Sequence, residues 1–366
     1  MSAPIHAPHA HAGTTVQRIM LAVMAALAPA TLYGFWLYGW PAIVLWCVTV
    51  GSAALGEAFA LRLAERPVAP ALSDGSVVLT GWLLALSLPP WAPWWIGALG
   101  GAFAAIVGKQ VFGGIGQNLF NPAMIARVAL LISFPVEMTR WVAPAPLFTD
   151  AAPGLLQGLS IAFLGLPDAD AMTSASLLGH AKTELSRGIG LGAALQAHAD
   201  PTALFGGVRP GSLGETSALL LLAGGLLLLW LRVFTWHIPA AMLAAVALPA
   251  AALHALDPQR YADAGVHLFS GGLMLGAWFI ATDPVTSPGS RGGQLLFGAG
   301  CGLLTYVIRT WGGYPEGVAF AVLLMNAVTP VIDRYVKPRI YGRTRRGEGF
   351  APPPRKWLRL RRRSGP

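Results

Sequence analysis

Residues 108–127 read GKQVFGGIGQNLFNPAMIAR, a run of glycines and amides with one proline between two strongly apolar segments. In lipid, every backbone N–H and C=O must find a partner inside the protein. Broken, glycine-rich backbone is therefore tolerated there only where it is buried or lines a cavity. Asn121 and Pro122 fit a helix start, as N-cap and first helical residue. The stretch predicts either a tight loop that reverses the chain or a polar site among membrane helices.

The composition around this stretch is that of a polytopic membrane protein. Of 366 residues, 55% are hydrophobic and only 11% are charged. The two cysteines, Cys47 and Cys301, lie in apolar runs, which excludes a disulfide framework and the thiolate set of an iron–sulfur cluster. Any redox role of this chain must therefore use an organic cofactor.

The net charge of +9 is concentrated in residues 333–366, which hold twelve basic and two acidic residues. A basic tail after the last span marks the cytoplasmic side of the membrane by the positive-inside rule. Nucleic-acid binding would also explain such a tail, but nothing else in the chain supports it. Residues 1–17, which include three histidines, are interpreted as a disordered cytoplasmic arm rather than a metal site.

Apolar runs of about 20 residues predict an all-α fold with about ten transmembrane helices. We expect them near residues 18–38, 41–62, 76–90, 93–110, 121–135, 213–233, 237–254, 266–282, 293–310 and 315–332. An even number of spans places both termini in the cytoplasm, on the side of the basic tail. The chain then divides into two membrane halves of five helices, residues 18–135 and 212–332, around a periplasmic segment, residues 136–211, that is long enough to be functional.

The two halves contain a hint of an internal repeat. WLLALSLP at 82–89 resembles WFIATDP at 278–284, and the glycine pair 113–114 matches the pair 312–313. Five helices per half would give the halves opposite topology, and inverted repeats place ligand sites near the midplane, at broken helices. Chance similarity between sequences rich in leucine and alanine is the other explanation.

Residues 170–176 (DAMTSAS) place three hydroxyls, Thr173, Ser174 and Ser176, after an aspartate in the external segment. On the residues alone, this pattern predicts a helix start ahead of LLGHAKTEL, with a serine or threonine as N-cap.

Five blocks together resemble the D subunits of Rnf electron-transport complexes and, more distantly, the B subunits of Na⁺-translocating NADH:quinone reductases. They are GGIGQNLFNPAM at 113–124, DAMTSASL at 170–177, GSLGETSA at 211–218, ATDPVTSP at 281–288 and GGYPEGVAFAVLLMN at 312–326. In this family the second block has the form D-x-x-[S/T]-[G/S]-A-T, and a flavin transferase attaches FMN to the final Thr through a phosphoester. The resemblance implies covalent FMN on Ser176, which stands at that position here, with Thr173 as the fallback.

The resemblance also implies a second, non-covalent flavin. In the related quinone reductases the residues matching Asn118 and Asn121 contact riboflavin, and two side-chain amides suit the edge of a neutral heterocycle. Gly113, Gly114 and Gly116 are expected to allow close approach of the backbone to that ligand.

Four charged residues are expected within helices or at their ends. Arg127 is expected inside a helix, where a buried arginine needs a flavin or a carboxylate such as Asp283 as its partner. Asp283 is either a polar cap or part of an ion path. Glu215 fits simple helix capping, and the role of Glu316 is open.

The resemblance implies a membrane flavoprotein of the bacterial inner membrane that relays electrons between ferredoxin and NAD, coupled to movement of Na⁺ or H⁺. Because the chain has no dinucleotide motif and no cluster ligands, NAD and ferredoxin would meet other Rnf subunits. The alternatives are a secondary transporter or channel of the inverted-repeat type without flavin, and a protein like the B subunits of the quinone reductases.

Overall fold

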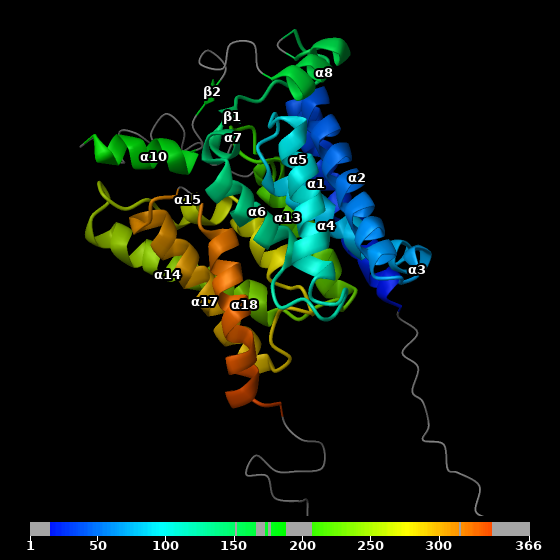
Figure 1. The fold of residues 1–366 in the computed structure, drawn as a ribbon. Coiled ribbons are helices and arrows are strands. Elements are labelled where there is room, and N and C mark those ends of the chain that lie inside the picture. Colours follow the sequence, from blue (N-terminus) through cyan, green and yellow to red (C-terminus); the bar gives the residue numbers. More distant parts are fainter. Residues whose placement is uncertain are drawn as a thin grey trace, which may run out of the picture.

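The computed structural model describes residues 15–150, 152–165, 173–174, 177–187, 207–314 and 316–338. Within these ranges the chain forms a helical bundle with one small sheet (Figure 1). The prediction of a mostly helical, multi-pass membrane protein is confirmed. In the described part, four helices are long and apolar enough to cross a membrane: α1 (Val16–Tyr38), α2 (Trp40–Leu63), α14 (His237–Leu256) and α18 (Val318–Tyr335).

The other predicted spans also contain helices, but these are shorter or less apolar. They are α4 (Ser76–Ser87), α5 (Trp94–Ala105) with its π-helical extension η1 (Ile106–Gln110), α6 (Pro122–Ser133), α13 (Ala218–Trp230) and α17 (Arg291–Trp311). Side-chain caps fix several starts: Ser217 caps α13 and Ser290 caps α17. Asn121 caps α6 by accepting from the amides of Ala123 and Met124, so the expected role of this residue as an N-cap is confirmed.

The expected continuous helix at 266–282 is wrong, because the chain breaks there. It forms α15 (Ala264–Phe269), then an extended Ser270 and two glycines, then α16 (Leu273–Leu275) and the π-helix η3 (Gly276–Ile280). Gly271 has a φ of +68°, in the left-handed region that ends helices. The sequence Ser-Gly-Gly is therefore the local cause of the break.

The segment at 136–211, called the external segment here after its expected location, contains a feature that the all-α prediction missed. β1 (Trp141–Val142) pairs antiparallel with β2 (Thr173–Ser174), so that Trp141 lies opposite Ser174. Three short helices accompany this sheet: α7 (Pro135–Thr139), α8 (Leu155–Leu164) and α10 (Leu177–Ser186). In Figure 1, α8 and the sheet lie at the end of the bundle opposite the start of α1 and the end of α18. Two further short elements, α3 (Val68–Ser73) and the 3₁₀ turn η2 (Leu213–Glu215), join larger helices.

Two helix pairs form the tightest contacts of the bundle: α2 packs on α5, and α14 packs on α17. Glycines make both contacts possible. A Cβ on Gly101 would collide with the Thr49 carbonyl and the Ser52 hydroxyl, and a Cβ on Gly302 would collide with the Met242 carbonyl. Small residues that let helix backbones approach closely are typical of membrane interfaces.

Candidate functional site

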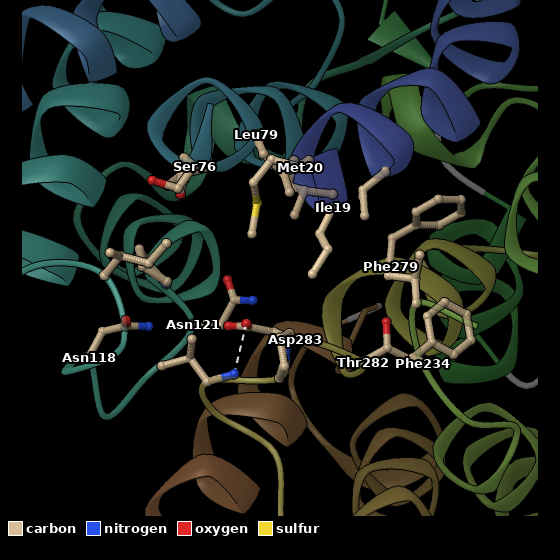
Figure 2. Close-up of a pocket in the computed structure, with 18 of the residues that line it drawn as sticks. Ile19, Met20, Ser76, Leu79, Asn118, Asn121, Phe234, Phe279, Thr282 and Asp283 are labelled. Carbon is tan, nitrogen blue, oxygen red and sulfur yellow. Dashed lines mark hydrogen bonds between the residues drawn. The ribbon is translucent and has the colours of Figure 1, made fainter. Parts of the chain in front are cut away.

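A cavity lies where the starts of α1 and α4 meet η1, the loop before α6, α13 and the segment after η3. It encloses about 790 Å³ of empty space, and this figure includes the open mouth. Figure 2 shows Ser76 and Asn118 toward one side of the cavity, with Phe234 and Phe279 toward the opposite side. The cavity therefore has a polar end and an apolar, aromatic end.

The structure places Asn118 and Asn121 together in this cavity, but their amides are not equally available. The side-chain oxygen Oδ1 of Asn121 caps α6, and the Nδ2 of the same side chain lies 3.4 Å from the Ile280 carbonyl oxygen. Asn118 makes one short-range contact, from Nδ2 to the Phe120 carbonyl at 3.2 Å. Asn121 thus fastens α6 to the end of η3, whereas Asn118 has more hydrogen-bonding capacity left for a ligand.

Gly113, Gly114 and Gly116 shape the loop and do not line the cavity. Their φ angles are +113°, +99° and +84°, so each occupies a backbone region that side chains disfavour. Arg66, which follows α2, donates from Nη1 to the Gly113 carbonyl oxygen, and the two atoms are 3.0 Å apart. These glycines are thus required by the turn itself, which carries Asn118 to the cavity wall.

Asp283 lines the cavity, and its carboxylate also stabilises the turn after η3. It accepts from the Val285 amide at 3.1 Å and from the Thr286 hydroxyl at 3.2 Å. The first of these contacts is drawn in Figure 2. The capping role is therefore visible in the geometry, while the position in the cavity keeps a carboxylate available to a ligand or an ion.

Arg127 lies away from this cavity, and Asp283 is not its partner. It lines a separate cavity of about 340 Å³ with Ser212, Glu215 and Glu316. The two carboxylates are its attractive charges, and its Nη1 lies 3.6 Å from the Met138 sulfur. Arg127 thus belongs to a polar group nearer the external segment.

A buried ion pair that the sequence did not reveal borders the polar end of the first cavity. Lys109 of η1 lies 2.7 Å from Glu57 of α2, and their side chains are 4% and 1% exposed. Lys109 also donates to the Ser76 hydroxyl at 2.6 Å. The only sequence signals were one acid and one lysine within apolar runs, and their distance of 52 positions gave no indication of a pair.

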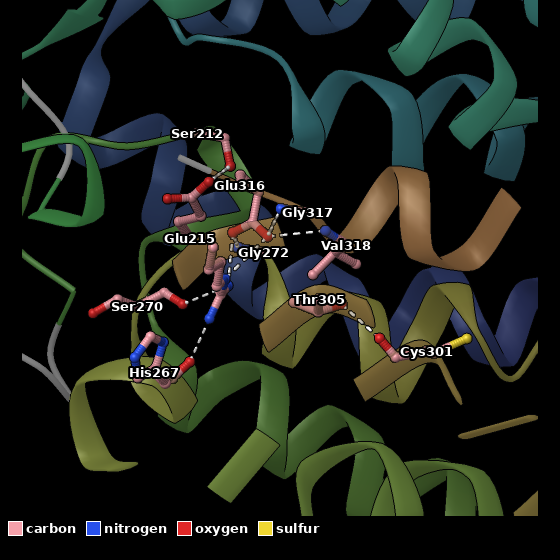
Figure 3. A network of polar contacts seen from close by, with 11 residues as sticks. Ser212, Glu215, His267, Ser270, Gly272, Cys301, Thr305, Glu316, Gly317 and Val318 are labelled. Atoms are coloured by element: carbon pink, nitrogen blue, oxygen red, sulfur yellow. Dashed lines mark hydrogen bonds and ion pairs between the residues drawn. The ribbon is translucent and has the colours of Figure 1, made fainter. Parts of the chain in front are cut away.

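A second ion pair, between the buried Arg309 and the partly buried Glu316, closes the break between α15 and α16 (Figure 3). The Arg309 guanidinium donates to the carbonyls of His267 at 2.6 Å and Ser270 at 3.1 Å, and it pairs with Glu316 at 2.7 Å. Glu316 in turn accepts from the Gly272 amide at 2.8 Å. The pair therefore satisfies backbone groups that the break removes from helical hydrogen bonding.

A cleft lies against this pair on the side of the external segment, with about 520 Å³ of empty space when its open mouth is included. Its lining includes Trp141, Leu177, Arg209, Glu215 and Glu316. Ser176 lies outside the described residues, but Leu177, which directly follows it, lines this cavity. The aromatic ring, the guanidinium and the apolar side chains are suited to a flavin phosphate or ring.

The helix α10 is held against α15 and the end of α17, beside the cavity lined by Trp141 and Leu177. Leu177 and Ala181 pack on Ala262 and Val266. Lys182 donates to the carbonyls of Arg309, Gly312 and Tyr314 at the end of α17, where the helix dipole favours a cation. Burial lowers the pKa of the Lys182 ammonium from its ordinary value.

Comparison with known proteins agrees with this architecture along almost the whole chain. The model of the NQR2, RnfD, RnfE family matches residues 4–342. A protein of Halorhodospira halophila, named as the D subunit of an ion-translocating oxidoreductase complex, is 54% identical over 347 residues, which is 95% of this chain and 97% of that protein. Proteins of the same name from Stutzerimonas stutzeri and Rhodobacter capsulatus are 55% and 49% identical, over 94% and 84% of this chain and 97% and 86% of their own lengths. The chain therefore belongs to the NQR2, RnfD, RnfE family.

Proposed function

We propose that this chain is the membrane flavoprotein subunit of an Rnf-type ion-translocating oxidoreductase complex. Three relatives that cover most of the chain are named as the D subunit of such a complex. As one subunit it would relay electrons inside the membrane, while ferredoxin and NAD meet other Rnf subunits. The relay would be coupled to movement of Na⁺ or H⁺ across the bacterial inner membrane.

Ten spans in two inverted five-helix repeats are the architecture that we propose for this function. The matching contacts of α2 with α5 and of α14 with α17 support it, because these are the second and fourth spans of each half. In Figure 1, α1 starts and α18 ends at the same end of the bundle, which is consistent with an even number of spans. That end would face the cytoplasm, and the segment at 136–211 would face the periplasm.

The cavity beside Asn118 is the observation that carries the flavin proposal, and riboflavin is the ligand that we assign to it. A flavin ring has an apolar dimethylbenzene end and a polar pyrimidine end, and the cavity walls are divided in the same way. Trp278, Phe279 and Phe234 would contact the apolar end, and Asn118 would hydrogen-bond the pyrimidine edge. A bound flavin would supply an acceptor for one or two electrons.

We assign the second flavin, FMN in phosphoester linkage, to Ser176, with Thr173 as the alternative acceptor. The start of α10 directly after Ser176 supports this assignment, since helix N-termini favour phosphate. The adjacent cavity with Trp141 and Arg209 offers room for the ring or the phosphate. A flavin transferase would be the partner in maturation.

Denaturing-gel fluorescence tests the covalent flavin directly. The chain produced with its flavin transferase should give a fluorescent band at 38.3 kDa. The band should be lost in Ser176→Ala and kept in Thr173→Ala, and mass spectrometry of the peptide containing Ser176 should show the added FMN. A colourless wild-type band would overturn the covalent assignment.

Extraction of the purified protein with acid or solvent tests the second flavin. Riboflavin should be released from the wild type and from Ser176→Ala, but not from Asn118→Leu, which removes the amide and keeps a side chain of similar volume. Release of equal riboflavin from Asn118→Leu and wild type would place the ligand elsewhere.

A further inference from the structure

Lys109 carries a buried charge that the packing of apolar membrane helices does not require. It is 3% exposed and lines the polar end of the cavity with Ser76 and Asn118. An ammonium group has three N–H donors. Among the described residues, two of them are accounted for by Glu57 and Ser76. The third donor is available to a molecule in the cavity.

The ion pair with Glu57 costs desolvation energy, and apolar replacements of buried pairs are often as stable. Stability alone is thus a weak reason for this pair. Within the described part of the chain, Glu57 Oε2 is buried without a hydrogen-bond partner, so the carboxylate is not fully satisfied by the protein. Lys109 also sits in the π-helical turn η1, and π-turns within α-helices frequently occur at functional sites.

The position of Lys109 within the cavity indicates what its charge would face. Ser76 and Asn118 mark the polar end, opposite the aromatic side chains Phe234 and Phe279 (Figure 2). A flavin bound with its pyrimidine atoms at the polar end would present them to the Lys109 ammonium. Charge near these atoms is one of the ways in which proteins tune a flavin.

We propose that Lys109 is the cation that raises the reduction potential of the flavin in this cavity, and that Glu57 is a positioning residue that holds the ammonium in place and offsets part of its charge. This inference rests on the proposal that the cavity binds riboflavin. Negative charge that builds up on the pyrimidine ring during reduction is stabilised by the ammonium and opposed by the Glu57 carboxylate. The two residues therefore act on the potential with opposite signs.

The test is a spectroelectrochemical titration of riboflavin bound to the full chain, produced without flavin transferase so that covalent FMN does not contribute. At a fixed applied potential, Lys109→Gln should lower the ratio of reduced to oxidised flavin by about tenfold or more, and Glu57→Gln should raise it by a similar factor. Lys109→Arg should keep most of the wild-type ratio. Thr183→Val in α10, outside this cavity and without a charge change, should leave the ratio unchanged.

Shifts of both single variants in the same direction, or no shift in either while riboflavin stays bound, would overturn the inference. If Lys109→Gln folds poorly or binds riboflavin poorly, two other measurements still test the inference. They are the direction in which Glu57→Gln changes the ratio of reduced to oxidised flavin, and the same ratio in Glu57→Gln/Lys109→Gln. The double variant should lie between the two single ones. A wild-type chain that binds no riboflavin would instead overturn the proposed function of the cavity, and fluorescence quenching on titration with riboflavin detects that outcome separately.

Discussion

The pairs Glu57–Lys109 and Arg309–Glu316 both have N–O distances of 2.7 Å and lie toward opposite ends of the bundle, but only the first is buried on both sides, because the Glu316 side chain is 22% exposed. Around Arg309 and Glu316, the partners are backbone groups of the broken helix, such as the Ser270 carbonyl and the Gly272 amide. Around Lys109, the partners are side chains, and one face opens on a cavity. The comparison teaches that the same ionic chemistry closes a gap in the backbone at one end and leaves a charge available to a ligand at the other.

The largest expected effect is the loss of Arg309. Arg309→Met should lower the free energy of unfolding by roughly 3–5 kcal/mol, because it leaves the Glu316 carboxylate without its cation and two backbone carbonyls without their donor. Thermal unfolding in detergent measures this loss. The control is Glu184→Gln, which breaks the exposed Glu184–Arg187 pair and should cost at most about 0.5 kcal/mol. Equal melting of Arg309→Met and the control would show that the pair does not hold the break.

Removal of both charges at once should separate the two pairs. In Glu57→Gln/Lys109→Gln, most of the stability lost in either single variant should return, because no charge is left buried and unpaired. In Arg309→Gln/Glu316→Gln it should not return, since the backbone groups at Ser270 and Gly272 still lack their partners. The same melting experiment on the four single and two double variants checks this. Equal recovery of stability in the two double variants would show that the two ion pairs do not differ in this way.

Two glycines with left-handed backbone should respond differently to alanine. Gly271→Ala adds a Cβ that would meet the Glu316 carboxylate and the Arg309 guanidinium, whereas Gly116→Ala faces open space. Gly116→Ala should cost only the backbone strain of about 1–2 kcal/mol, and Gly271→Ala should cost clearly more. Melting midpoints measured side by side would contradict this expectation if Gly116→Ala were the less stable variant.

The smallest effect is expected at the external segment. Lys182→Met removes the donor to three carbonyls at the end of α17 and should loosen α10 by about 0.5–1.5 kcal/mol locally. Faster amide hydrogen exchange over residues 177–186, with unchanged exchange in α2 and α5, is the expected readout. Unchanged exchange in α10 would mean that the apolar contacts of Leu177 and Ala181 suffice to hold it.

The sequence predicted the helices and the region of the cavity well, because long apolar runs and the Asn-Pro helix start are local signals. Asn118 and Asn121, which the family resemblance pairs as contacts of one ligand, both line one cavity. The break at Gly271 was missed because its flanks are apolar enough to continue a helix. The partners of Lys109 and Arg127 could not be predicted, since the partner of a buried charge depends on how distant helices pack.

The glycine contacts between α2 and α5 and between α14 and α17 have a consequence for reading mutational data on this chain. Any side chain at Gly101 or Gly302 would strike the backbone of the facing helix. Such positions will score as intolerant in a saturation screen whether or not a flavin is bound. Intolerance along these two seams therefore reports the assembly of the scaffold, and only intolerance at cavity-lining positions bears on the proposed flavin.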